Sequence, residues 1–325
     1  MTLSVVDSRI SGGTHDCPIV ALQIDPLESL NPKTDTSLML GAEAIARDML
    51  LFAYTPCDLT YGGSSIYATG RFFKTDINGV VIEVGDRVRF PLEEASYVLV
   101  RQNPPYDMGY ITCLDILSNL PITTRVLNDA KTLRSWSEKS IPLMFKDLCP
   151  LTCITRNPKE IYAFLAAEKV AILKPLYGFG GQDVFILKQN DANVDVIIDM
   201  MRNRYPYGVI VQEFISDVAF NDRRLLMIDG KLKAVFKRIP QEGMVRSNMA
   251  VGGTPMACII SEADRIIESW LSPFLSAHGI MLAGIDVIGS YLNEVNITSP
   301  TGLRFAQHLY GCDLAKDFWD VVLSS

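Results

Sequence analysis

Apolar runs of strand length alternate with helical patterns in the first part of the chain. The expected elements are strands at 18–24, 50–54 and 97–101 and helices at 37–49 and 111–120. Strands that alternate with helices are typical of βαβ units, in which neighbouring strands run parallel. The pattern therefore predicts a parallel sheet within residues 18–135, after an N-terminal extension of residues 1–17.

The pattern changes in the rest of the chain. Residues 136–215 are expected to contain helices at 158–168 and 194–201 and strands at 170–173, 184–187 and 209–214. Residues 216–325 are expected to contain strands at 224–228 and 232–238 around the turn Asp229-Gly230, a helix at 261–277, a hairpin of 282–288 with 292–298, and a terminal helix within 306–325. These changes place domain boundaries near residues 136 and 215.

Composition narrows the class of protein. The 325 residues are enough for about two domains, or three small ones. The 30 basic and 37 acidic residues give a net charge of −7, which argues against a nucleic-acid binder. The longest charge-free runs, 247–261 and 270–285, are shorter than the roughly 18 residues of a membrane span and contain Gly or Pro.

Location is predicted from the N-terminus and the cysteines. The first ten residues lack the basic and apolar segments of a secretory signal. The seven cysteines, an odd number, are expected to be reduced thiols in the core. Both observations predict a cytoplasmic protein.

A glycine-rich loop follows a predicted strand in the middle of the chain. Lys174 ends the strand, and Gly178, Gly180 and Gly181 follow. Glycine lets backbone N–H groups approach an anion closely, and the lysine adds a compact positive charge. The order differs from a Walker loop, in which the lysine follows the glycines. Two interpretations remain open here: a phosphate-binding loop and a tight hairpin.

Carboxylates face one another on the predicted hairpin near the C-terminus. Glu294 and Asn296 share a face, because side chains alternate along a strand. A three-residue loop at 289–291 would place Asp286 directly opposite Glu294. Such like charges repel unless a hard cation such as Mg²⁺ binds between them. A different register, or solvated edge residues, is the alternative.

Arginines are frequent in the last third of the chain. They are Arg223, Arg224, Arg238, Arg246 and Arg304. The guanidinium group binds carboxylates and phosphates through two parallel hydrogen bonds. Together with the glycine-rich loop and the predicted metal ligands, these residues indicate ATP-driven chemistry on a carboxylic acid.

Several ordered motifs resemble bacterial glutathione synthetase, a family of the ATP-grasp superfamily. The run 286–301 (DVIGSYLNEVNITSPT) is similar to the family signature, as are 174–181 (KPLYGFGG) and the segment from Arg238-Ile-Pro-Gln to Gly253. Further matches are Ile24-Asp25-Pro26 with Asn31 and Lys33, the run 101–107 (RQNPPYD), and Ser137-Glu138-Lys139. The resemblance extends in the family's order from about residue 18 to residue 305.

The resemblance implies an α/β protein with the ATP-grasp fold. Its parts would be an N-terminal parallel-sheet domain for substrate binding (18–135), a small central lid domain (136–215) and a C-terminal antiparallel-sheet catalytic domain (216–325). The implied reaction is ligation of γ-glutamylcysteine with glycine through an acyl phosphate, giving glutathione, ADP and phosphate. The implied cofactors are ATP and Mg²⁺, with Mn²⁺ as an alternative, and the implied assembly is a homo-oligomer that acts on small molecules only.

The resemblance also implies roles for individual residues. Those matched to ATP binding are Lys139, Lys174, Tyr177, Gly178, Phe179, Gly180, Gly181, Gln212, Glu213, Phe214, Ile215 and Asp222. The residues matched to catalysis around the acyl phosphate are Arg224, Arg238, Arg246 and Asn248. The matched metal ligands are Asp286, Glu294 and Asn296. The residues matched to substrate binding are Asp25, Arg101, Ser299 and Thr301.

Departures from the family pattern concern the periphery of the substrate site. Tyr177 stands where the family usually has an acidic residue, and 302–305 (GLRF) differs from the family's Cys-Ile-Arg-Glu. ATP-dependent ligation is therefore a firmer expectation than glycine as the acceptor. The alternatives are another ATP-grasp carboxylate–amine ligase and a non-catalytic scaffold that binds nucleotide.

Overall fold

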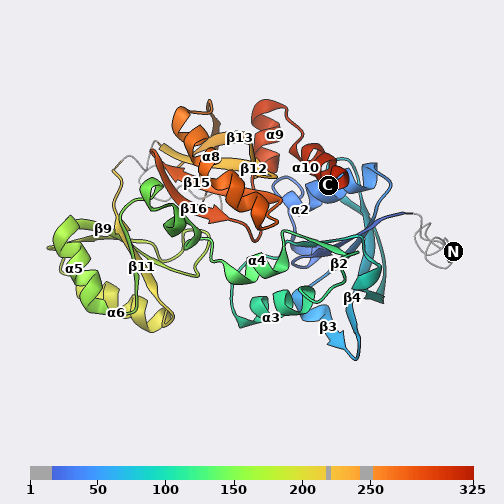
Figure 1. Ribbon diagram of the computed structural model, residues 1–325, viewed down its shortest axis with the longest axis horizontal. Coiled ribbons are helices and arrows are strands. Elements are labelled where there is room, and N and C mark those ends of the chain that lie inside the picture. Colours follow the sequence, from blue (N-terminus) through green and yellow to red (C-terminus); the bar gives the residue numbers. More distant parts are fainter. Residues whose placement is uncertain (1–16, 217–220, 242–251) are drawn as a thin grey trace.

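Three β-sheets arranged along the long axis of the molecule form the framework of the protein (Figure 1). The structure is a computed structural model that describes residues 17–216, 221–241 and 252–325. Sheet A belongs to the N-terminal part, sheet B to the middle of the chain, and sheet C to the C-terminal part. Sheet C lies between the other two sheets in Figure 1.

Sheet A is parallel at its centre and antiparallel at one side. Its parallel strands are β1 (Ile19–Gln23), β2 (Leu50–Tyr54), β6 (Tyr97–Val100) and β7 (Arg125–Leu127). Its antiparallel strands are β3 (Leu59–Gly62), β4 (Ser65–Thr75) and β5 (Val81–Pro91). The prediction of a parallel sheet within residues 18–135 is therefore wrong for residues 59–91. Those residues form hairpins, which need no crossover helix, and much of β5 faces solvent.

The helices of the N-terminal part are α2 (Thr36–Ala46), α3 (Met108–Leu117) and α4 (Ala130–Ser135). Each begins after an aspartate whose side chain accepts a hydrogen bond from a backbone N–H in the first turn. These aspartates are Asp35, Asp107 and Asp129. The first two helices confirm the expected ones, with shifted ends.

Sheet B is a small antiparallel sheet with its own core. Its order is β10 (Phe185–Lys188), β9 (Val170–Pro175), β11 (Val209–Glu213) and β8 (Thr152–Thr155). The helices α5 (Pro158–Glu168) and α6 (Val194–Arg204) lie on the same side of the sheet in Figure 1. Residues such as Leu173, Ile198 and Val211 form a cluster that no residue of the other sheets joins. Sheet B is thus a separate packing unit.

Sheet C is antiparallel throughout. Its order is β14 (Thr254–Ala257), β13 (Lys231–Ile239), β12 (Asp222–Ile228), β15 (Leu282–Ile288) and β16 (Tyr291–Asn296). The predicted turn Asp229-Gly230 is confirmed, with both residues at positive φ, as a tight hairpin of this kind requires. Helix α8 (Glu262–Ala277) begins at a capping box of Ser261 and Asp264.

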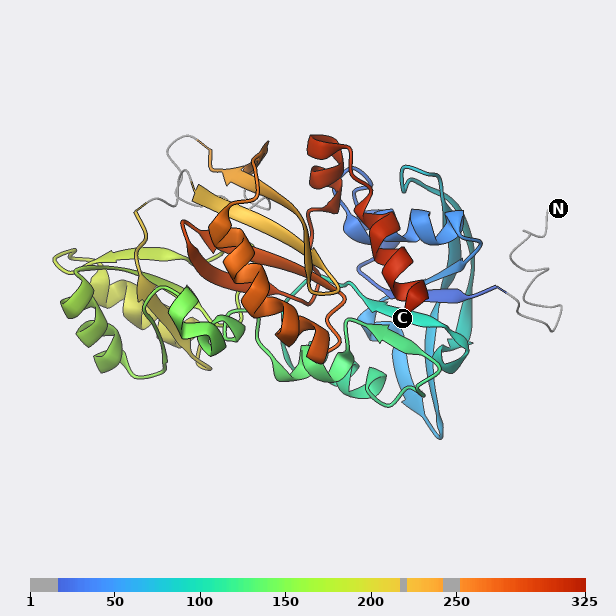
Figure 2. The same cartoon turned by 45° about the horizontal axis from the view of Figure 1, so that its top comes forward.

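The C-terminal segment crosses back to sheet A. It forms α9 (Leu303–Tyr310) and α10 (Leu314–Ser324), so the expectation of one terminal helix is wrong. Gly311 has φ +68° and ends α9, and Asp313 caps α10. The Trp319 indole donates a hydrogen bond to the Leu40 carbonyl at 2.8 Å, and α10 lies beside α2 (Figure 2).

Two larger hydrophobic clusters each combine residues of sheets A and C. One contains Phe52 and Ile285, and the other contains Leu22 and Phe236. The N-terminal and C-terminal parts therefore share their cores. The described residues thus pack as one large body with sheet B attached to it.

The structure adds two further facts, about the helices and about the thiols. None of the described helices is long and apolar enough to cross a membrane. Among the described cysteines only Cys113 is buried and Cys57 is exposed, which corrects the expectation of core thiols.

Asn128 connects the two parts of the large body. Its side chain accepts hydrogen bonds from the N–H groups of Met281 and Leu282 and donates to the carbonyls of Leu282 and Ile297, at 2.7–2.9 Å. Asn128→Ala is expected to lower the free energy of unfolding by at least about 2 kcal/mol, because buried polar groups lose their partners. Denaturant unfolding measures this. The exposed Asn119→Ala control should stay within about 0.5 kcal/mol of the parent protein.

Candidate active site

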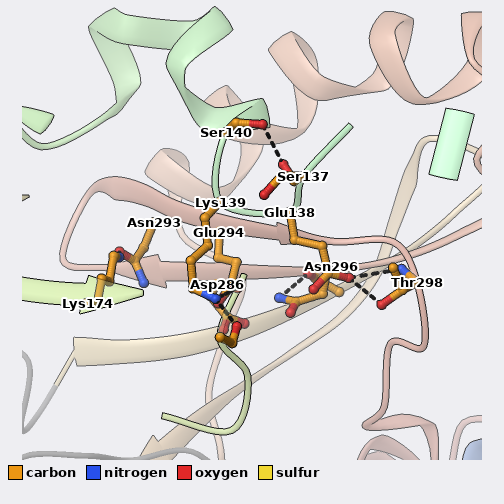
Figure 3. Close-up of polar contacts among 12 residues, drawn as sticks. Ser137, Glu138, Lys139, Ser140, Lys174, Asp286, Asn293, Glu294, Asn296 and Thr298 are labelled. Atoms are coloured by element: carbon orange, nitrogen blue, oxygen red, sulfur yellow. Dashed lines mark hydrogen bonds and ion pairs between the residues drawn. The ribbon is translucent and has the colours of Figure 1, made fainter. Parts of the chain in front are cut away.

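A cavity of about 330 Å³ lies between sheets B and C. Its walls come from the glycine-rich loop, from the end of β11 with the residues that follow it, from the face of sheet C, and from the segments 138–139 and 298–302. Figure 3 shows the charged centre, where Lys139 and Lys174 approach the hairpin that carries Asp286 and Glu294. Residues far apart in sequence thus meet in one polar cavity.

The hairpin β15–β16 has the predicted pairing at Asp286. Asp286 pairs with Glu294, and Gly284 pairs with Asn296. The loop has two residues instead of the expected three, because Ile288 pairs with Tyr291. A bulge at Asn293 restores the register, since Val287 pairs with Leu292 and the next pair is Asp286 with Glu294. The expected pairing of the two carboxylates across the hairpin is therefore confirmed, although a two-residue loop and a bulge produce it.

Arginines bind the carboxylates at the floor of the cavity. Arg224 donates to Asp286 Oδ1 at 2.6 Å, and Arg238 donates to Asp286 Oδ2 at 3.1 Å and to Asp222. Burial alone would raise the pKa of Asp286, but the two guanidinium groups outweigh it and lower the pKa. Asp286 is therefore a charged carboxylate at neutral pH.

The two predicted lysines contact residues of β16 in the same cavity. Lys174 donates to Gln212 Oε1 at 2.9 Å and to Asn293 Oδ1 at 3.0 Å. Lys139 lies 3.1 Å from Glu294 Oε1 and donates to the Gly178 carbonyl. Burial lowers the pKa of Lys174 to about 8, although Glu294 opposes this. The bulge at Asn293 thus supplies one of the contacts that hold Lys174.

This pKa gives Lys174 a pH-dependent affinity for anions. A bound phosphate favours the charged ammonium and raises its pKa above about 8, so nucleotide binding takes up a proton above that pH. Nucleotide affinity should be constant well below pH 8 and fall as pH rises beyond it, approaching about tenfold per pH unit. Titration calorimetry with ADP between pH 7 and 9.5 measures this. The Lys174→Met variant should bind ADP weakly at every pH, and its affinity should not fall with pH above 8. An equal pH dependence in the variant would contradict the assignment of Lys174 to the phosphates.

The glycine-rich loop is a long connection between strands. It joins β9, which ends at Pro175, to β10, which begins at Phe185, so the tight-hairpin interpretation is wrong. Gly180 and Gly181 have φ of +60° and +72°, a region that favours glycine. A Cβ at Gly178 would lie 2.3 Å from Pro175 Cγ. The loop conformation thus depends on all three glycines.

Glu138 is a residue of the cavity to which the sequence analysis gave no role. Its Oε1 accepts hydrogen bonds from the N–H groups of Ile297 and Thr298 and from the Thr298 hydroxyl, at 2.7–2.9 Å. Figure 3 shows its side chain directed at Thr298. Burial raises the pKa of Glu138, and the Glu294 carboxylate raises it further. The only indication in the sequence that Glu138 belongs to the site was its place beside Lys139.

Most predicted site residues line this cavity. They are Lys139, Lys174, Gly178, Phe179, Gly180, Gly181, Gln212, Glu213, Phe214, Ile215, Asp222, Arg224, Arg238, Asp286, Glu294, Asn296, Ser299 and Thr301. Tyr177 lines a smaller neighbouring cavity. Arg246 and Asn248 lie outside the described residues.

Two of the predicted substrate residues do not line the cavity. Arg101 is buried and donates to Ser37 Oγ at 3.2 Å and to the Pro300 carbonyl at 2.9 Å. Asp25 accepts a hydrogen bond from the N–H of Asn103 at 3.1 Å. Asn103 itself lines the main cavity. In this structure Asp25 and Arg101 thus support the loops around the cavity and do not line it.

The donor set fits a divalent cation that also binds phosphate. No group of three or more His, Cys, Asp or Glu among residues 17–216, 221–241 and 252–325 could hold a metal ion alone. Asp286, Glu294 and Asn296 offer oxygen atoms on one face, which suits Mg²⁺ completed by substrate phosphates. The described cavity lining carries four basic and five acidic side chains, so a polyphosphate needs added positive charge to bind there.

Comparisons with known proteins place this arrangement in a family. Residues 19–134 match the prokaryotic glutathione synthetase N-terminal domain, and residues 138–311 match the prokaryotic glutathione synthetase ATP-grasp domain. The chain is 39% identical to glutathione synthetase of Mesorhizobium japonicum and 38% identical to that of Brucella melitensis. Each match covers 93% of this chain and 97% of the relative.

A solved structure supports the fold independently. The RimK-domain ATP-grasp protein from Sphaerobacter thermophilus superposes with a TM-score of 0.62 at 19% identity. The superposition covers 93% of this chain and 98% of the other. Sequence and fold agree: the chain belongs to the prokaryotic glutathione synthetase family and has the ATP-grasp fold.

Proposed function

We infer that this protein is an ATP-dependent ligase that joins γ-glutamylcysteine to glycine and releases glutathione, ADP and phosphate. The observation that carries this conclusion is the meeting of two lysines, a glycine-rich loop and an all-oxygen donor set around one cavity. Family membership supplies the substrates, because the curated relatives are glutathione synthetases. The parts of the site match the needs of phosphoryl transfer, which are positioning and charge neutralisation.

In the first step a carboxylate oxygen of γ-glutamylcysteine attacks the γ-phosphorus of ATP. The bond to the β,γ-bridging oxygen breaks, ADP leaves, and an acyl phosphate forms. We assign Lys139 and Lys174 to the ATP phosphates and the end of β11, from Gln212 to Ile215, to the adenine. Arg224 and Arg238 would hold the reacting carboxylate and its developing charge.

In the second step the amine of glycine attacks the acyl carbon. The C–O bond to phosphate breaks and an amide forms; one ammonium proton leaves with phosphate and one goes to solvent. Arg224 and Arg238 would stabilise the oxyanion of the tetrahedral intermediate. The glycine-rich loop from Tyr177 to Gly181 would exclude water from the acyl phosphate.

ATP and divalent metal ions are the cofactors of this family. We propose Mg²⁺ as the ion, with Mn²⁺ as an alternative, and Asp286, Glu294 and Asn296 as its protein ligands. The ion would neutralise the phosphate charge in a cavity that already holds five acidic side chains. We also propose that Ser299 and Thr301 contact the substrates, and that Asp25 and Arg101 position the loops that do so.

Domain division, assembly and location stay predictions. We propose that residues 136–215 act as a lid over the catalytic part at 216–325, with residues 18–135 as the substrate-binding part. The protein is expected to be cytoplasmic and homo-oligomeric.

ADP release tests the proposed function. With Mg-ATP and γ-glutamylcysteine, release should be strong only when glycine is added. A panel of other amines and acids provides the comparison. Release with another pair alone would identify a sibling ligase, and tight ATP binding without release would identify a scaffold.

A further inference from the structure

The bulge in the β15–β16 hairpin changes the direction of one side chain. Side chains alternate along a regular strand, so two consecutive residues face opposite sides of the sheet. Here Leu292 and Val295 both belong to a buried hydrophobic cluster. Asn293 and Glu294, which lie between them, both line the main cavity. A bulge opposes two residues to one and re-aims a side chain, so the extra residue brings Asn293 into the cavity.

In the cavity Asn293 contacts the ammonium group of Lys174 (Figure 3). Lys174 Nζ donates to Asn293 Oδ1 at 3.0 Å and to Gln212 Oε1 at 2.9 Å. The Gln212 amide is oriented by its own NH₂ group, which donates to the Thr152 hydroxyl at 2.8 Å. The ammonium group is thus held by one amide oxygen of sheet B and one amide oxygen of sheet C.

Both acceptors of Lys174 are neutral, which favours the binding of an anion. An ammonium group has three N–H donors, so two amide oxygens leave it a donor and its full positive charge for a phosphate. Lys139 differs, because its partner at 3.1 Å is the Glu294 carboxylate, which cancels part of its charge. Lysine has a flexible four-carbon stem, and fixed acceptors restrict where its charge lies. Asn293 thus directs the Lys174 ammonium without competing with a bound anion.

We propose that the bulge makes Asn293 a positioning residue, which directs the Lys174 ammonium at the phosphates of ATP. The proposal rests on the proposed function, because that function assigns Lys174 to the phosphates. It also explains why the hairpin has a bulge at this place. A regular hairpin with the same Asp286–Glu294 pair would direct the side chain of residue 293 to the opposite face of the sheet, away from Lys174.

A double-mutant cycle tests this role. Titration calorimetry measures the binding of Mg-ADP to the parent protein, Asn293→Ala, Lys174→Met and the double variant. Asn293→Ala should weaken ADP binding about tenfold, the effect of losing one hydrogen bond to a charged group. In the Lys174→Met background the same substitution should change the affinity by less than about twofold, because the group that Asn293 holds is gone. Ser290→Ala, exposed in the turn of the same hairpin, is the control and should bind ADP like the parent protein.

Steady-state kinetics and thermal unfolding of the same samples separate positioning from a structural role. In Asn293→Ala the KM for ATP should rise in step with the loss of ADP affinity. The KM values for γ-glutamylcysteine and glycine should change much less, and the unfolding temperature should stay close to that of the parent protein. A joint rise of all three KM values with a lower unfolding temperature would indicate a structural role and overturn the proposal.

The cycle separates this proposal from the proposed function, because ADP binding needs neither the acid nor the amine. A loss of affinity that depends on Lys174 supports the positioning role even if the enzyme joins other substrates. An equal loss in both backgrounds, or an unchanged ADP affinity in Asn293→Ala, would overturn the positioning role. An unchanged ADP affinity in Lys174→Met would overturn the assignment of Lys174 to the phosphates, and the role of Asn293 with it.

Discussion

Glu294→Gln is expected to lower kcat by about 100-fold or more, the usual effect of removing a charged group that acts on the transition state. The substitution keeps the shape of the side chain but removes a proposed metal ligand and the partner of Lys139 at 3.1 Å. The stability of the fold should change little. The lost ion pair is mostly buried, but the variant also relieves the repulsion from Asp286 directly opposite, which offsets the loss.

Steady-state kinetics at saturating ATP and peptide, with thermal unfolding of the same samples, measures both effects. Glu262→Gln, exposed on α8, is the control and should keep its activity. Raising the Mg²⁺ concentration should partly restore turnover in Glu294→Gln if the carboxylate binds the metal. Activity close to that of the parent protein would remove Glu294 from the set of metal ligands.

Arg238→Met is expected to lower the free energy of unfolding by about 3–5 kcal/mol, the range found when one partner of a buried ion pair is removed. Arg238 is 3% exposed and contacts both Asp222 and Asp286, which are 5% and 2% exposed. These carboxylates would stay buried with one cation fewer. The carboxylates raise the pKa of Arg238 despite its burial, so its charge is not lost at ordinary pH.

Urea unfolding of the parent protein and of Arg238→Met at pH 7 measures this difference in the free energy of unfolding. Arg265→Met is the matched control, because Arg265 forms an exposed pair with Glu268 on one turn of α8. Exposed pairs contribute about 0–1 kcal/mol, so the control should differ little from the parent protein. A loss below about 1 kcal/mol in Arg238→Met would mean that the network at the cavity floor relaxes easily, and would contradict a preorganised site.

The hairpin shows how far sequence patterns can reach. The sequence pattern, combined with an expected three-residue loop, was enough to pair Asp286 with Glu294 and to put Asn296 on the same face as Glu294. It could not reveal the bulge at Asn293, because a two-residue loop with a bulge and a three-residue loop give the same register at Asp286. The bulge nevertheless matters, since Asn293 contacts Lys174.

The N-terminal part contains strands that the hydrophobic pattern predicts and others that it does not. The predicted strands at 18–24, 50–54 and 97–101 form the parallel centre of sheet A. The hydrophobic pattern does not predict the strands within residues 65–91, because much of β5 faces solvent and such a strand has weak hydrophobic contrast. Glu138 was missed for a related reason. Its partners at 297–298 are far away in sequence, and only the fold brings them together.

The transfer of oxygen from substrate to phosphate tests the central claim most directly. γ-Glutamylcysteine labelled with ¹⁸O in its C-terminal carboxylate is converted with Mg-ATP and glycine, and the released phosphate is analysed by mass spectrometry. An acyl phosphate predicts one ¹⁸O atom in each phosphate, because the carboxylate oxygen leaves with the phosphoryl group when the amine attacks. Unlabelled phosphate accompanied by glutathione formation would contradict the acyl-phosphate account of this site.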